Sequence, residues 1–143
     1  MSIWFETPKL EDLNLLMENI QIHRSLGLEI TEIGDDFIRG TMPADERTFQ
    51  PFGVVHGGAN VVLAETLGSI AGYLCVDKNK FQVFGQEVSA SHIRSISTGI
   101  VTATARAVHL GSRSQIWEIH MHNDLGKLSC LSKLTMAVVP IRR

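Results

Sequence analysis

One long segment of this chain is almost free of charge, and it constrains the fold more than any other feature. Between Thr48 and Val76 the only formally charged side chain is Glu65. Within the segment, apolar side chains recur at the spacing of one helix face: Leu63, Leu67, Ile70 and Leu74. The pattern predicts a single long helix over residues 58–75, whose apolar stripe faces a sheet.

The remaining chain supplies that sheet. Apolar residues at helical spacing first predict a helix over residues 10–20, with Thr7 as its N-cap. Strand-like runs between turn signals then predict strands over residues 28–33, 37–42, 82–93, 99–108, 115–121 and 128–138, and the last three alternate in places between apolar and polar residues. One long helix against antiparallel strands is an α+β arrangement. No repeat or linker interrupts the chain, so residues 1–143 are expected to form one domain.

Composition excludes several classes of protein. The formal net charge of −2 gives no reason to expect nucleic-acid binding. A carboxylate in the middle of the uncharged segment argues against a membrane helix, and the N-terminus has no signal-peptide pattern, so we expect a cytoplasmic protein. Cys75 and Cys130 are too few for a metal cluster, and His120 and His122 lack a third ligand, so no metal is expected.

Glu65 projects away from the apolar stripe, about 160° from its middle. Gly68 and Gly72 fall on the same side, and each interior helix glycine costs about 1 kcal/mol relative to alanine. We therefore expect a second subunit and a substrate to approach this side closely, which predicts at least a homodimer. A structural glutamate bonded to a hydroxyl such as that of Ser69 is the alternative interpretation.

The loop before the long helix points to chemistry. Gly57 and Gly58 follow His56 at the predicted helix start, where backbone N–H groups have no partner within the helix. The helix dipole adds partial positive charge there. Such a site can stabilise an oxygen that acquires negative charge, as an oxyanion hole does.

The stretch from Gln50 to Leu74, which reads QPFGVVHGGANVVLAETLGSIAGYL, resembles the signature of hotdog-fold thioesterases. It is most similar to the group that acts on 4-hydroxybenzoyl-CoA (Arthrobacter type) and in the phenylacetate pathway, including the 1,4-dihydroxy-2-naphthoyl-CoA hydrolases of menaquinone biosynthesis and the proofreading thioesterases of enterobactin synthesis. The resemblance extends to residues 92–94, 109–113 and 115–118. It implies a hotdog fold, in which five or six antiparallel strands wrap around one central helix, and a homodimer that pairs into a homotetramer.

The resemblance also implies roles for single residues. Glu65 matches the catalytic carboxylate, a nucleophile or a general base, and Gly57 the N–H that contacts the thioester oxygen. The other matching positions are catalytic Gln50, His56 and Ser69, and the coenzyme A rim of His92, Arg94, Ser112 and Arg113. The implied substrate is an aroyl-CoA, an acyl-CoA or a carrier-protein thioester, hydrolysed without a cofactor or metal.

Two other functions remain open at this point. A hotdog dehydratase or hydratase would add or remove water on an acyl thioester, and a non-catalytic module would only bind acyl-CoA. Within the thioesterase interpretation, Phe52, Val61 and Tyr73 are candidates to line an apolar pocket for the acyl group.

Overall fold

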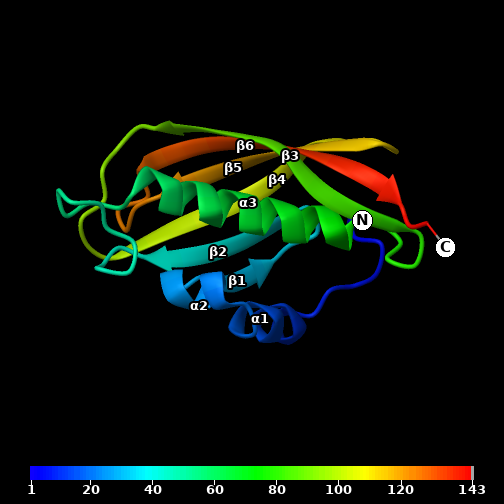
Figure 1. Cartoon of the computed structure of the whole chain (residues 1–143), viewed down its shortest axis with the longest axis horizontal. Helices are drawn as coiled ribbons and strands as arrows, with labels where there is room; N and C mark the ends of the chain where they lie inside the picture. The colour runs from blue at the N-terminus through cyan, green and yellow to red at the C-terminus, as the bar shows by residue number, and fades with distance from the viewer. Residues whose placement is uncertain (143) are drawn as a thin grey trace.

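A computed structural model describes residues 1–142, which form three helices and six strands. In chain order these are α1 (Leu10–Glu18), α2 (Gln21–Leu26), β1 (Glu29–Ile33), β2 (Phe37–Pro43), α3 (Gly57–Leu74), β3 (Phe81–His92), β4 (Ile100–Leu110), β5 (Ser114–His122) and β6 (Leu128–Pro140). The strands form one antiparallel sheet in the order β1-β2-β4-β5-β6-β3 (Figure 1). The predicted α+β fold of one sheet and one long helix is confirmed.

The sheet curls around α3, which lies across its concave face (Figure 1). Along β5, alternate side chains are fully buried against the helix, because successive residues of a strand point to opposite faces. Trp117, Ile119 and Met121 have no exposed surface, nor do Leu63 and Leu67 of α3. The core therefore lies between α3 and the inner face of the sheet.

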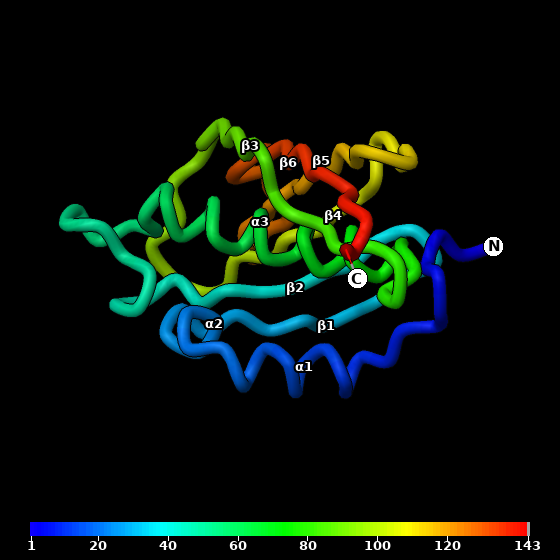
Figure 2. The backbone as a smooth tube through the Cα atoms, turned by 45° about the vertical axis from the view of Figure 1, so that its right-hand side comes forward, coloured from blue at the N-terminus to red at the C-terminus, as the bar shows by residue number. Residues whose placement is uncertain are grey.

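The short helices α1 and α2 lie beside β1, at one edge of the sheet (Figure 2). The chain before α1 is held by tertiary bonds: the Phe5 N–H donates to the Leu74 carbonyl at 2.8 Å, and the Trp4 indole N–H donates to the Gly34 carbonyl at 2.8 Å. Helix α1 therefore begins only at Leu10, with Lys9 at the N-cap position and no side-chain cap. The prediction of a Thr7 cap was wrong: these bonds tie the chain before α1 to α3 and to the β1–β2 turn, and the helix begins two residues beyond Pro8.

The expectation for the two helix glycines was also wrong. Gly68 and Gly72 are buried against this chain's own sheet, not on a side left for a partner. A Cβ on Gly68 would lie 2.6 Å from Cδ2 of Leu134, and one on Gly72 would lie 2.5 Å from Oε1 of Gln115. The curled sheet encloses more of the helix circumference than a flat sheet would, so residues outside the predicted stripe also pack against strands.

Within residues 1–142, none of the helices combines the length and the apolar character that a membrane crossing requires.

Replacing Gly72 with alanine tests the packing of α3 against the sheet, because the substitution should lower and not raise the free energy of unfolding. Alanine in an unobstructed helix interior usually stabilises a protein relative to glycine. Here the new methyl group would meet the buried amide of Gln115, which also donates to the Gly72 carbonyl at 3.2 Å. We expect Gly72→Ala to lower the free energy of unfolding by about 1–3 kcal/mol, measured by chemical denaturation.

Thr66→Ala is the control, because Thr66 lies in the same helix but is only half-buried. It is expected to change the free energy of unfolding by less than about 0.5 kcal/mol. A Gly72→Ala protein more stable than wild type would contradict the packing described above.

Candidate active site

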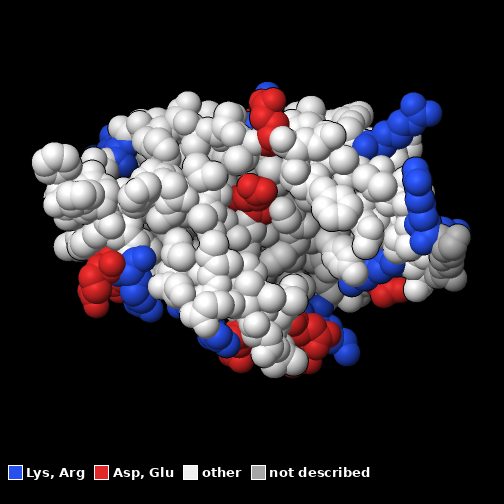
Figure 3. All heavy atoms as spheres, in the orientation of Figure 1, with Lys and Arg blue, Asp and Glu red and all other residues white. Residues whose placement is uncertain are grey.

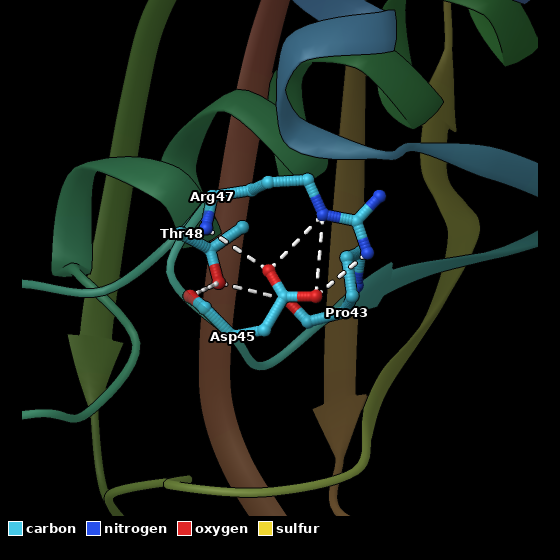
Figure 4. A network of polar contacts seen from close by, with 4 residues as sticks. All are labelled: Pro43, Asp45, Arg47 and Thr48. Carbon is cyan, nitrogen blue, oxygen red and sulfur yellow. Dashed lines mark hydrogen bonds and ion pairs between the residues drawn. The ribbon is translucent and has the colours of Figure 1, made fainter.

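A polar network holds the loop that leads from β2 to α3 (Figure 4). The Thr48 hydroxyl donates to the Pro43 carbonyl at 2.7 Å, and its own carbonyl accepts the His56 N–H at 2.7 Å. Arg47 donates through its guanidinium and its backbone N–H to the Asp45 carboxylate, and these bonds lower the pKa of Asp45. The network fixes the point at which the chain enters α3.

The start of α3 presents a backbone donor. His56 is the N-cap, and its Nδ1 accepts the Gly58 N–H at 2.8 Å. The Gly57 N–H, in contrast, has no acceptor among the residues that the structure describes. This donor lies at the positive end of an 18-residue helix, so an anionic or polarised oxygen is favoured beside it.

A cleft of about 290 Å³ opens beside this helix start. Four of the predicted site residues line it: Gln50, Gly57, His92 and Arg94. The Gln50 Oε1 accepts the Phe52 N–H, and Arg94 donates to the Leu128 carbonyl at 2.8 Å, so a backbone group holds each side chain at the cleft. His56 adjoins the cleft through the cap itself.

Glu65 lies two turns further along α3, on the side turned toward β3. Its Oε2 is 2.7 Å from the position that a Cβ on Gly85 would occupy, so glycine at this point of β3 leaves room for the carboxylate. Figure 3 shows acidic atoms in the middle of this face, surrounded by uncharged side chains, while most other charges lie along the rim. Glu65 is only half-buried and remains accessible to a ligand.

An apolar groove of about 470 Å³ begins one helical turn beyond Glu65, at Ser69. Ile70 and Tyr73 of α3 line it together with Phe84 of β3. Ile70 was expected to face the sheet but faces this groove and is only partly buried. Of the residues suggested for an acyl pocket, Tyr73 lines the groove, whereas Val61 and Phe52 do not, and Phe52 is 89% exposed.

The structure also separates predicted site residues. Ser112 and Arg113 lie in the turn between β4 and β5, where the Arg113 carbonyl accepts the Val138 N–H. Val138 pairs with Val83, nine residues along β3 from His92, which puts this turn about 30 Å from the cleft. Within one helix, Gly57 and Glu65 are eight residues, about 12 Å, apart.

Burial raises the pKa of the Cys75 thiol to about 11, so this thiol is protonated at neutral pH and is a poor nucleophile.

Asn60 lines the cleft beside His92, and sequence reasoning missed it. A polar amide on the apolar side of an uncharged helix was the one signal that could have identified it.

Comparison with known proteins gives a consistent result. The profile described as the thioesterase superfamily matches residues 52–130. A crystallised mutant of thioesterase PA1618 from Pseudomonas aeruginosa superposes with a TM-score of 0.95 at 49% identity, covering 98% of this chain and 100% of that one.

Two named relatives are nearly as similar over their full length. The 1,4-dihydroxy-2-naphthoyl-CoA hydrolase of Escherichia coli is 45% identical over 96% of this chain and 99% of its own length. The proofreading thioesterase EntH of Cronobacter turicensis is 46% identical over 96% of this chain and 98% of its own. The chain therefore belongs to the thioesterase superfamily and has the hotdog fold.

Proposed function

We propose that this protein hydrolyses acyl-CoA or aroyl-CoA thioesters to the free acid and coenzyme A. The observation that carries the proposal is the position of Glu65, an accessible carboxylate over Gly85 in a segment with no other charge. Small and apolar residues around a carboxylate reduce its hydration without adding a partner charge, so its retention at an accessible position favours a catalytic role.

The chemistry needs two groups at one thioester. The Gly57 N–H, strengthened by the dipole of α3, polarises the carbonyl and stabilises the oxyanion. In one route Glu65 attacks the carbonyl carbon, the C–S bond breaks to release the thiolate, and water then cleaves the mixed anhydride to the free acid and the Glu65 carboxylate. In the other route Glu65 removes a proton from a water that attacks the carbonyl carbon, and the C–S bond breaks to release the thiolate and the free acid. Gln50 and His56 orient the reacting groups at the helix start, and the Ser69 hydroxyl assists beside Glu65.

These two groups of one chain cannot meet one substrate, because about 12 Å of helix separates Gly57 from Glu65 and a reacting carbonyl must lie about 3 Å from each. We therefore propose that Glu65 and Ser69 act with Gln50, His56 and Gly57 of the partner subunit. Strand β3 supports this arrangement, since it is a 12-residue edge strand next to Glu65 whose free backbone groups suit a second copy. Pairing of two such dimers would give the homotetramer.

The same pairing would unite the coenzyme A rim. His92 and Arg94 lie at one end of β3 and Ser112 and Arg113 near the other. An antiparallel partner strand would bring the second pair of one subunit toward the first pair of the other. Arginine at both positions suits the nucleotide phosphates of coenzyme A.

The groove beyond Ser69 supports a bulky apolar or aromatic acyl group, with Tyr73 and Phe84 as aromatic walls. A naphthoyl group related to that of the E. coli relative, and with it a place in menaquinone biosynthesis, is the substrate we favour. The free cysteines Cys75 and Cys130 suit the cytoplasm we propose for it. A panel of aroyl-, phenylacetyl- and straight-chain acyl-CoA, with carrier-protein thioesters, would rank the candidates.

Replacing Glu65 with glutamine is the direct test. We expect kcat to fall about 10²–10⁴-fold, because the amide can neither attack nor take a proton. The thermal midpoint should stay near that of wild type. The rate of hydrolysis is measured from the free thiol that the reaction releases. Near-normal turnover in Glu65→Gln would contradict the proposed role of Glu65. Hydration of crotonyl-CoA by wild type would instead favour the dehydratase or hydratase alternative.

A purified heterodimer of Glu65→Gln and Gln50→Ala protomers, selected with two affinity tags, tests the shared site. If each site combines Glu65 of one chain with Gln50 of the other, one site is intact and the other carries both changes. The heterodimer should then show about half of the wild-type activity. If each chain formed its own site, both sites would be defective and the activity would match that of the single variants.

Arg94→Ala and Arg113→Ala should each raise KM about ten- to a hundredfold with little change in kcat, because phosphate contacts remote from the reaction bind substrate and transition state equally. Arg24→Ala, on the exposed surface of α2, is the control and should leave both constants unchanged. A loss confined to kcat would contradict a role at the coenzyme A rim.

A further inference from the structure

Asn60 is placed in a way that its role in packing does not explain. It lies in the first turns of α3, is only 8% exposed and faces the cleft beside the helix start. Its side-chain Nδ2 is 3.3 Å from Nδ1 of His92. Its Oδ1 is buried and has no hydrogen-bond partner among the described residues. A buried amide with one end unpaired lowers the stability of the fold, so a role other than stabilising the fold must account for Asn60 at this position.

The contact between Asn60 and His92 indicates that role. His92, the last residue of β3, points to the inner side of the sheet and lies against Gly57. A Cβ on Gly57 would be 2.8 Å from Nε2 of His92, so this nitrogen is directly beside the residue that offers its free N–H to the substrate. The two ring nitrogens thus have separate surroundings: Nδ1 meets Asn60, and Nε2 meets the cleft.

We propose that Asn60 is a positioning residue that fixes the tautomer of His92. The Asn60 amide donates to Nδ1, which keeps the proton of the neutral ring on Nε2. The Nε2–H is then a second donor beside the Gly57 N–H and binds the oxygen of the thioester ligand. This inference rests on the proposed thioesterase function, adds Asn60 to its site, and gives His92 a role at the thioester oxygen in place of the rim role that the family resemblance implies.

A second asparagine shows what a structural role looks like in this protein. Both ends of the Asn14 amide are paired with β1, since Nδ2 donates to the Ile30 carbonyl at 2.9 Å and Oδ1 accepts the Ile30 N–H at 3.0 Å. The side-chain amide of Asn60 has one partner among the described residues, and that partner is a ring in the cleft. Alanine is also a better helix former than asparagine. Loss of the Asn60 side chain should therefore affect the ligand site more than stability.

The tautomer can be measured without any substrate. In ¹⁵N-labelled protein at about pH 8, where an ordinary histidine is neutral, long-range ¹H–¹⁵N correlation spectra distinguish a proton on Nε2 from one on Nδ1. His92→Gln assigns the signals among the six histidines. We expect the Nε2–H form in wild type and a mixture of tautomers in Asn60→Ala. A wild-type ring protonated on Nδ1, or spectra unchanged by Asn60→Ala, would overturn the proposal.

Kinetics test whether Asn60 acts through His92. Asn60→Ala should lower kcat/KM about tenfold, the loss expected for one hydrogen bond to a ligand, and should leave the thermal midpoint unchanged or raised. In a His92→Ala background the same change should have no further effect. Independent, multiplying losses in the double variant, or a thermal midpoint that falls with activity while the tautomer is unchanged, would instead identify Asn60 as a packing residue.

Asn14→Ala is the matched control and should lower the thermal midpoint while leaving kcat/KM at the wild-type value. If wild type hydrolysed no thioester, the proposed function would fail, whereas the spectra would still decide whether Asn60 fixes the ring of His92. The two hypotheses can therefore fail separately.

Discussion

The close contact between α3 and the sheet is the constraint on which the rest of the molecule depends. Glycine at positions 68 and 72 lets Leu134 and Gln115 pack directly on the helix backbone. At this separation the sheet buries half of the helix residues, and the opposite side of the helix remains accessible. Glu65 and Ser69 lie on that accessible side, and Gly57 with its free N–H stands at the start of the helix. The packing that forms the core therefore also decides which polar groups can meet a ligand.

Much of this architecture could be predicted from local patterns. The uncharged segment predicted the long helix, with bounds within one residue of those observed, and runs between turn signals, some of them alternating, predicted every strand of the sheet. Such patterns succeed because helix and strand periodicity record which side of an element is buried. They fail where tertiary contacts override local preference, as before α1: residues 3–5 are bonded to α3 and to the β1–β2 turn, and Lys9, not Thr7, is at the N-cap position.

The candidate site was predictable in part for a related reason. His56 and Gly57 are adjacent at the start of α3, and Glu65 lies two turns further along the same helix, so the position of each follows from sequence order alone. The partner of Asn60 is 32 residues away, and no spacing rule connects an asparagine in a helix to a histidine at the end of a strand. Periodicity likewise could not assign Gly68 and Gly72 to the chain's own sheet, because the curl of the sheet determines how much of a helix it covers.

Strand β3 has three roles: it packs against the core, makes room for the Glu65 carboxylate and forms a free edge of the sheet. Gly85 makes space for Glu65 on its inner side, and its outer border carries backbone groups that no neighbouring strand satisfies. If that border is where a second copy attaches, a newly synthesised protomer carries only unfinished halves of the catalytic apparatus. An unassembled protomer would then leave the cell's activated acids intact. The concentration of the protein would govern dimer formation and therefore the onset of hydrolysis.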